Sequence, residues 1–211
     1  MIDLEQIKTR IEAAVSGARL EIIPNGSSCG PHSLLMDNDH ALAAAKFVRD
    51  APELKFDYAS NVTGVDWLDS VARKTVKVKQ DVEGVEKDVD QVVEEKRPGY
   101  LEAVYHLFSM ELKHGPVVLR LRTEDRAGKA HLPSLTPIWR GAEFQEREIF
   151  DLYGVIFDGH PDLRRILMWE EYKDFPMRRD YVEPDDYEYE PTAHGPVLEK
   201  AKQHQAREAS R

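Results

Sequence analysis

The stretch that decides the fold is WRGAEFQEREIFDLYGVIFDGHPDLRRILMWEEYKDFPMRRD, residues 139–180. At 100° per residue, its first fifteen residues place the apolar side chains on one stripe of a helix. The members of this stripe are Trp139, Ala142, Ile149, Phe150 and Tyr153. Gly154 follows, and glycine commonly ends a helix in the left-handed conformation. The pattern predicts an amphipathic helix over residues 139–153, packed on a core.

One carboxylate interrupts the apolar stripe. Glu146 points into its middle, where an unpaired buried charge costs several kcal/mol, roughly. Arg164 and Arg165 follow after an extended segment that His160-Pro161 begins. A guanidinium binds a carboxylate through two parallel hydrogen bonds. We therefore expect Arg164 or Arg165 to fold back on Glu146.

The opposite face of the same helix carries a charge ladder. Glu143, Arg147 and Asp151 follow one another at i,i+4 spacing, which suits a solvent-facing helix surface. Phe144 and Glu148 share this outer face. An exposed Phe beside an ordered row of charges indicates a contact surface, although a lone surface aromatic is commoner than an interface.

The sequence before this stretch predicts an α+β domain. The apolar spacing indicates helices near both Ile2–Val15 and Leu42–Val48. Alternating or short apolar runs indicate strands at 20–23, 32–36, 55–60, 100–113 and 116–123, with loops at 61–69 and 128–133. Helices and strands in segregated runs favour a mostly antiparallel sheet with helices on one face. An extended C-terminal tail follows this domain.

Two segments stand apart from the domain. Residues 70–98 mix strand-like and helix-like valine spacing with nearly balanced charges, and we expect a solvated insertion there. After Asp180, the sequence EPDDYEYEP is too polar and proline-rich to bury enough area to order itself. The expected division is a globular domain at 1–157 and a partner-wrapping tail at 158–211.

Composition excludes several functional classes. The chain has 211 residues, is 41% hydrophobic and carries a net charge of −10, which argues against broad nucleic-acid binding. No apolar run approaches the roughly 18 residues of a membrane span. The single Cys29 excludes an intrachain disulfide and an all-cysteine zinc or iron–sulfur site.

Catalytic and cofactor motifs are also missing from the sequence. It has neither G-x-G-x-x-G nor a P-loop, so binding of NADH or flavin by those means is not expected. His160 lies between two aspartates in DGHPD, where a turn role is favoured over a metal ligand. Glu146, Glu148 and Asp151 could form a glycosidase-like carboxylate set, but a structural network is favoured. We expect no catalytic, cofactor-binding or metal-binding residue.

The residues quoted above also carry a resemblance. EREIFDLYGVIFDGHPDLRRIL, followed by FPMRRDY, resembles the signature of the C-subunit family of NADH-quinone oxidoreductase, from the peripheral arm of respiratory complex I. The likeness extends more loosely upstream, through LEAVYHLFSMELKHGPVVLRLR and FDYASNVTGVDWLD, over most of residues 1–182. Residues 70–98 depart from it as an insertion. Met177 and Tyr181-Val182 also depart from the family's usual ending.

The resemblance implies a function that belongs to an assembly. It implies a cofactor-less subunit of a proton-translocating enzyme that docks on the hydrogenase-like D subunit near the quinone-reducing end, with the iron–sulfur B and I subunits as further partners. NADH, FMN, iron–sulfur clusters and quinone would be handled by other subunits. The implied location is peripheral, at the cytoplasmic face of the inner membrane. The signature residues with implied docking or fold roles are Glu146, Arg147, Glu148, Asp151, His160, Pro161, Arg164, Arg165, Arg178, Arg179 and Asp180.

Two alternatives stay open at this point. The first is a homologous subunit of a membrane-bound hydrogenase or of a ferredoxin-fed quinone reductase. The second, from another class, is a stand-alone hydrolase that uses the carboxylates of Glu146, Glu148 and Asp151.

Overall fold

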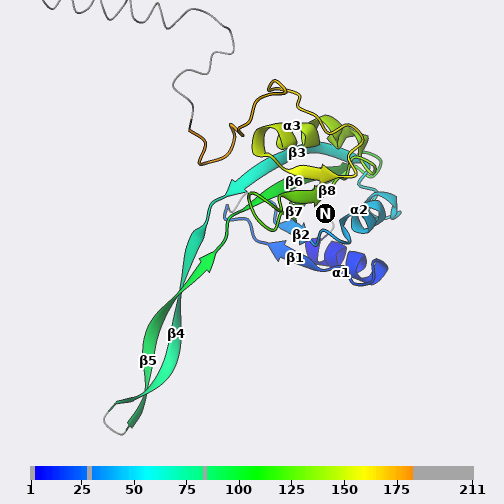
Figure 1. Cartoon of the computed structure of the whole chain (residues 1–211). Coiled ribbons are helices and arrows are strands. Elements are labelled where there is room, and N and C mark those ends of the chain that lie inside the picture. Colours follow the sequence, from blue (N-terminus) through cyan, green and yellow to red (C-terminus); the bar gives the residue numbers. More distant parts are fainter. Residues whose placement is uncertain (1–2, 28–29, 83–84, 183–211) are drawn as a thin grey trace, which may run out of the picture. The chain divides into compact units, whose positions relative to one another are not determined.

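The computed structural model describes residues 3–27, 30–82 and 85–182. Residues Met1–Tyr181 form one compact unit. Its described helices and strands are α1 (Leu4–Ala14), β1 (Leu20–Ile23), β2 (Ser33–Met36), α2 (Ala41–Asp50), β3 (Tyr58–Trp67), β4 (Ser70–Val82), β5 (Val85–Arg97), β6 (Tyr100–Ser109), β7 (His114–Arg122), β8 (His131–Pro133), the 3₁₀ turn η1 (Arg140–Ala142), α3 (Glu143–Tyr153) and β9 (Ile156–Asp158). Figure 1 shows their arrangement.

The main sheet, within the described residues, has five strands in the order β1-β2-β7-β6-β3. All its neighbours run antiparallel except β2 and β7, which pair in parallel. The sheet is therefore mixed but mostly antiparallel, as predicted. β8 and β9 form a small parallel pair beside it. The α+β class is confirmed.

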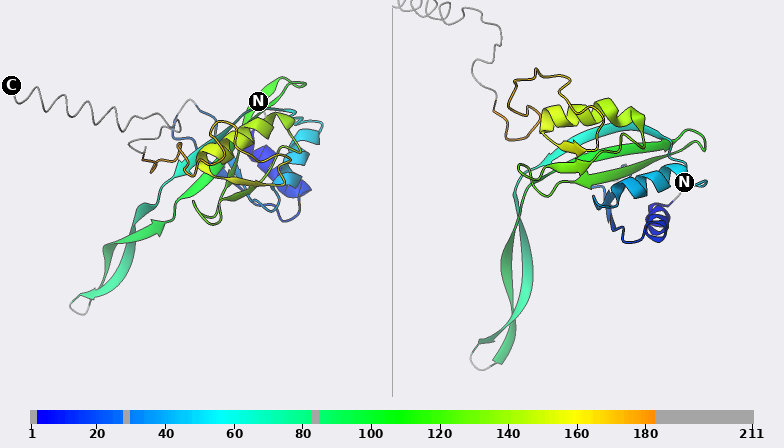
Figure 2. Two further views of the ribbon diagram at one scale, coloured as in Figure 1. Left: turned by 45° about the horizontal axis from the view of Figure 1, so that its top comes forward. Right: turned by 45° about the vertical axis from the view of Figure 1, so that its right-hand side comes forward.

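The register separates the two faces of this sheet. Side chains alternate across a strand, so every second residue of β6 faces the same side. Leu101, Ala103, Tyr105 and Leu107 are fully buried, and they belong to one hydrophobic core with buried residues of α1, α2 and α3. We call this side of the sheet the covered face. Figure 2 shows α3 beside β3, with α1 and α2 beside β1 and β2.

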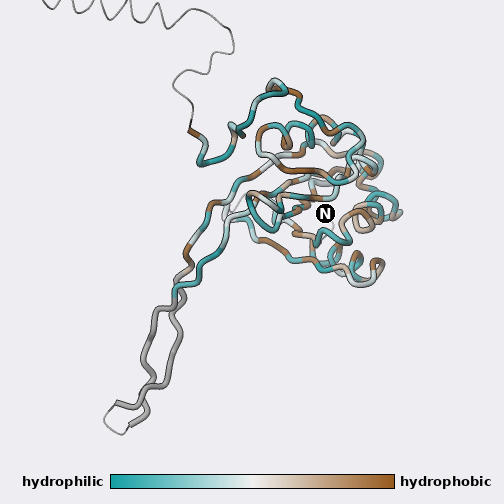
Figure 3. Tube along the Cα trace, viewed as in Figure 1, coloured by the Kyte–Doolittle hydropathy of each residue, from teal (hydrophilic) through white to brown (hydrophobic). Residues whose placement is uncertain are grey.

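The other side, which we call the open face, carries no helix among the described residues. Val104 and Val118 lie there, and although both are buried, neither belongs to the core shared by the helices. Hydrophobic and hydrophilic residues consequently mix along both helices and strands (Figure 3). Such mixing is expected for elements covered on one side only. The predicted placement of helices on one face of the sheet is thus confirmed.

Two local predictions were wrong. The segment 61–67 is part of β3 rather than a loop, since Val62, Gly64 and Asp66 face the core side while their neighbours face outward. Residues 131–133, predicted as loop, form β8 because β9 supplies a pairing partner 25 residues further along, at Ile156 for His131. The partner strands, β6 for β3 and β9 for β8, lie too far along the chain to be recognised from local sequence.

The two segments set apart in the sequence have different outcomes. β4 and β5 pair with each other over their whole length as an antiparallel hairpin, so the strand-like valine pattern is confirmed and the helix-like spacing does not form a helix. That this hairpin is an insertion stays a prediction. Residues 158–181, expected to belong to the tail, lie in the same compact unit as the preceding chain. The tail predicted beyond them, from residue 183, lies outside the described residues.

Candidate functional site

Helix α3 organises the site, as its sequence predicts. Trp139, just before η1, is buried and donates its indole N–H to the carbonyl oxygen of Phe56 at 2.7 Å. The helix itself begins at Glu143, later than predicted, because residues 140–142 form a 3₁₀ turn. Gly154 ends it at φ +76°, and the ring of Phe175 lies only 2.5 Å from where a Cβ would stand. Glycine is required there by both conformation and space.

Glu146 is fully buried in the apolar stripe, as predicted, but its partners are four neutral donors. Tyr105 Oη and the backbone N–H of Leu135 donate to Oε1 at 3.0 and 2.9 Å. Ser134 Oγ and Thr136 Oγ1 donate to Oε2 at 2.5 and 3.0 Å. Burial raises the pKa of Glu146, and these hydrogen bonds lower it by less, so the net pKa is raised.

The expected ion pair between Glu146 and a following arginine is therefore wrong. Arg164 is exposed and donates to Asp162 at 2.9 Å, while Arg165 Nη1 donates to Asp151 Oδ1 at 2.6 Å. The packed core places Tyr105 of β6 and residues 134–136 next to Glu146, and their donors satisfy both of its carboxylate oxygens. Sequence spacing alone did not reveal them.

Asp151 is the carboxylate that the arginine holds. It is fully buried, and its Oδ2 accepts the backbone N–H groups of Ile166, Leu167 and Met168 at 3.0, 2.7 and 2.9 Å. Burial raises the pKa of Asp151, but the backbone N–H groups and Arg165 outweigh it, so the net pKa is lowered. The ionised carboxylate thus fixes three consecutive residues of the following segment onto α3.

The predicted solvent-facing ladder on this side of α3 is wrong for two of its three members. Arg147 is 6% exposed and donates to the carbonyl oxygens of Arg164 and Arg165 at 3.2 and 3.3 Å. It and Asp151 are covered by the chain after β9. Phe144 and Glu148 are exposed as predicted, with Phe144 at 60%.

His160 fastens the start of the covering segment. The backbone N–H of Asp162 donates to its Nδ1 at 3.0 Å, so Nε2 carries the proton and donates to the carbonyl oxygen of Glu143 at 3.0 Å. Pro161, next to it, is exposed. Both ring nitrogens of His160 are thus used in shaping a turn, which agrees with the interpretation made from the sequence.

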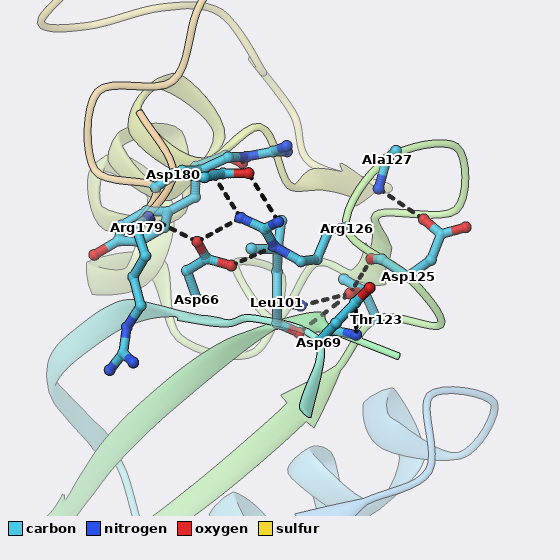
Figure 4. A network of polar contacts seen from close by, with 12 residues as sticks. Asp66, Asp69, Leu101, Thr123, Asp125, Arg126, Ala127, Arg179 and Asp180 are labelled. Carbon is cyan, nitrogen blue, oxygen red and sulfur yellow. Dashed lines mark hydrogen bonds and ion pairs between the residues drawn. The ribbon is translucent and has the colours of Figure 1, made fainter. Parts of the chain in front are cut away.

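A second charged network holds the end of the segment (Figure 4). Arg126 donates to both oxygens of buried Asp66, at 2.7 Å each, and to Asp180 Oδ1 at 2.7 Å. The backbone N–H of Arg179 also donates to Asp66, at 2.8 Å. Burial raises the pKa of Asp66, but Arg126 and the Arg179 N–H outweigh it and the net pKa is lowered.

Arg178 adds a further attachment. Its Nε donates to the carbonyl oxygen of Tyr153 at 2.7 Å, and its guanidinium lies 4.5 Å from the centre of the Phe175 ring. Burial lowers the pKa of Arg178. The backbone N–H of Met177 donates to Leu152 as well. We call residues 158–181 the strap, since Asp151, Tyr153 and Asp66 hold it along α3 and the end of β3.

The structure separates the carboxylates that a hydrolase would need together. Glu146 points into the core, Asp151 points to the strap, and Glu148 is exposed. Sequence reasoning missed Asp66 and Arg126, although Asp66 shares the core side of its strand with Val62 and Gly64. A carboxylate on an apolar face was the signal that identified Glu146, and it would have identified Asp66 once 61–67 was recognised as a strand.

The described ranges of the chain contain neither a metal-binding cluster nor a membrane-spanning helix. Within residues 3–27, 30–82 and 85–182, no group of three or more His, Cys, Asp or Glu side chains could hold a metal ion. In that same part of the chain, no helix has the length and apolar character needed to cross a membrane. Cys29 lies outside the described residues.

The fold and the strap together define an α+β chain whose buried charges hold its own backbone in place. The family described as "Respiratory-chain NADH dehydrogenase, 30 Kd subunit" matches residues 34–187. The chain belongs to this family of respiratory complex I subunits.

Individual relatives agree with the family match. The C subunit of the NADH-quinone oxidoreductase of Roseiflexus castenholzii is 33% identical over 85% of this chain and 84% of its own length. The second of the C subunits of NADH-quinone oxidoreductase in Rhizobium meliloti is 32% identical over 74% of this chain and 69% of its own length. A solved structure titled as Nqo5 of a trypsin-resistant fragment is similar over 76% of this chain and 98% of that fragment, with 23% identity and a TM-score of 0.44.

Proposed function

We propose that this chain is a docking subunit of a proton-translocating NADH-quinone oxidoreductase, and that it contributes no catalytic residue of its own. The observation that carries the proposal is the family match over residues 34–187. The curated relatives that share most of its length are named as the C subunit of that enzyme. NADH, FMN, iron–sulfur clusters and quinone would then be handled by neighbouring subunits.

The use of the signature charges supports this proposal. Asp151, Arg165 and Arg147 are buried or half-buried and hold the strap on α3. Buried charges that are committed to hydrogen bonds fix a backbone conformation, and they are poorly placed to exchange protons with a substrate. The strap would accordingly present a defined surface to the hydrogenase-like D subunit near the quinone-reducing end, with the iron–sulfur B and I subunits beside it.

The proposed setting is peripheral, at the cytoplasmic face of the inner membrane, with attachment through the other subunits. A tagged full-length chain, expressed in its native host, tests the proposal. We expect the flavin-, NADH- and iron–sulfur-binding subunits to co-purify, and NADH:quinone activity of the membranes to be lost when the gene is deleted and restored by the tagged copy. Co-purification with hydrogenase or ferredoxin-dependent subunits instead would assign the chain to a related complex.

A further inference from the structure

The open face of the main sheet has buried residues although no helix of the described part of the chain covers it. Val104 and Val118 are buried at its centre, yet they are separate from the core that the helices share. A sheet face without a packed layer exposes its cross-strand side chains to whatever lies beside it.

A single carboxylate organises those side chains. Glu102 is fully buried, and it accepts hydrogen bonds from Trp67 Nε1 at 2.8 Å, Arg120 Nη1 at 3.1 Å and Arg122 Nη2 at 2.9 Å. Two guanidiniums share one carboxylate, so the cluster keeps a positive charge. That sign is opposite to the net charge of −10 carried by the whole chain.

Aromatic rings and a third arginine extend the cluster. The Arg122 guanidinium lies 4.0 Å from the centre of the Tyr100 ring. The Arg179 guanidinium lies 5.9 Å from the centre of the Trp67 ring, and its side chain points away from the Asp66 network (Figure 4). The strap therefore delivers a signature arginine to the open face. We call this set the arginine–aromatic face: Trp67, Tyr100, Glu102, Arg120, Arg122 and Arg179.

Two polar atoms on this face are buried and lack a hydrogen-bond partner within the described part of the chain. They are Nε of Arg120 and Nδ1 of His106. His106 lies opposite Val118 in the register, and Arg120 lies opposite Val104. Buried polar groups in folded proteins nearly always have partners. Both atoms are covered by the chain itself, so a partner's carboxylate would meet the accessible parts of the arginines instead. The side chains of Arg120 and Arg122 are 25% and 33% exposed, and Arg179 is exposed.

We propose that the arginine–aromatic face is the surface on which a neighbouring protein of the complex binds through its own Asp or Glu side chains. The inference rests on the proposed function, and it names the surface and the chemistry of the partner. Arg, Trp and Tyr are the residues enriched at protein interfaces and at their energetic centres.

The test changes the charge of the face without touching its hydrogen-bond network. Thr63 is exposed on β3, directly opposite Val104 in the register. Thr63→Glu and Thr63→Arg add flexible side chains of opposite charge. Ala43→Glu and Ala43→Arg, at an exposed position of α2, are the matched controls. Each tagged full-length variant is purified from the host, and the identified subunits of the complex are quantified.

We expect Thr63→Glu to lower the recovery of those subunits about tenfold, since like charges across an interface are strongly unfavourable. Thr63→Arg and both Ala43 variants should retain wild-type recovery, and all four should keep wild-type melting temperatures. Equal recovery with Thr63→Glu and Thr63→Arg overturns the inference while leaving the proposed function intact. If the wild-type chain recovers no other subunits at all, both proposals fail.

A second measurement addresses a membrane as the alternative occupant. Purified chain is mixed with vesicles containing about one-third phosphatidylserine, and sedimentation is measured in low salt. We expect the wild-type chain and Thr63→Glu to sediment with the vesicles to the same extent. Vesicle binding that is lost in this variant, together with unchanged recovery of subunits, would assign the face to an anionic lipid surface and overturn the proposal.

Discussion

Glu146 and Asp151 are two fully buried carboxylates five residues apart on α3, and the protein stabilises them by different means. Neutral hydroxyl and amide donors surround Glu146, while Asp151 receives a guanidinium and three successive backbone N–H groups. Their pKa values consequently move in opposite directions, upward for Glu146 and downward for Asp151. The first carboxylate fixes the core and the second fixes the strap.

Replacing Glu146 should distinguish loss of shape from loss of hydrogen bonding. Glu146→Leu leaves four buried donors unsatisfied and should lower the free energy of unfolding by at least about 3 kcal/mol. Glu146→Gln keeps an acceptor for Tyr105 and Leu135, and the hydroxyls of Ser134 and Thr136 can rotate to accept, so we expect a loss of about 1–2 kcal/mol. Urea unfolding of both variants measures the difference. Equal losses of unfolding free energy in the two variants would show that the unsatisfied donors are not the cause of the destabilisation.

Asp151→Asn should destabilise the protein by about 3 kcal/mol at neutral pH, because it leaves Arg165 without its buried anion. The lowered pKa of Asp151 fixes the pH dependence. The contribution is complete above the ordinary value of 3.8 and is lost as the pH falls through the lowered pKa. The stability difference between wild type and variant should therefore shrink on acidification below about pH 4. Exposed Glu148→Gln is the control, with a change within about 0.5 kcal/mol.

At the scale of elements, α3 and the strap depend on each other. Position 154 must be glycine because Phe175 of the strap occupies the space of a Cβ, and the strap follows the helix because Asp151 binds its backbone. β3 contributes the second attachment through Asp66. Carboxylates from elements that precede the strap thus hold it at two places, Asp151 at residues 165–168 and Asp66 at Arg179.

Asp66→Asn and Asp180→Asn should separate the inner and outer parts of the network around Arg126. The Asp66 side chain is 1% exposed and that of Asp180 is 56% exposed. An exposed ion pair contributes about 0–1 kcal/mol, whereas breaking a buried one costs about 3–5 kcal/mol. We expect trypsin to cleave after Arg178 and Arg179 much faster in Asp66→Asn, with little change in Asp180→Asn. Similar cleavage rates in the two variants would contradict this assignment.

At the scale of the whole molecule, the sheet has two faces with different tasks. The covered face packs the three described helices around one core. The fully buried strand residues of this core are Leu34, Leu101, Ala103, Tyr105, Leu107, Leu119 and Leu121. The open face uses a central carboxylate, arginines and aromatic rings instead. A sheet with a packed core on one face and a polar cluster on the other is the arrangement expected of a subunit that binds neighbouring subunits through the second face.

The extent of the folding unit can be tested by truncation. A chain that ends at residue 157 lacks the donors to Asp151, the Arg178 contact with Tyr153 and the Arg179 N–H to Asp66. We expect it to melt well below a chain that ends at residue 182, or to be unfolded, because buried Asp151 would lose its partners. Identical melting curves for the two chains would restore the boundary at 157 that the sequence alone favours.

The sequence by itself determined the elements whose pattern is local. The apolar stripe of α3, the burial of Glu146 within it, the glycine end of the helix and the α+β order of elements all follow from periods of two or 3.6 residues. The family signature is likewise contained in consecutive letters of residues 146–181. Each of these features depends on residues no more than a few turns apart.

Only the tertiary structure decided which groups satisfy the buried charges. Tyr105 and Glu146 are 41 residues apart, Asp66 and Arg126 are 60 apart, and Asp66 and Arg179 are 113 apart. A buried carboxylate requires donors, but any nearby hydroxyl, amide or guanidinium meets that requirement. The choice among them is made by which strands and loops the packed core brings within hydrogen-bonding distance, and no local period in the sequence encodes it.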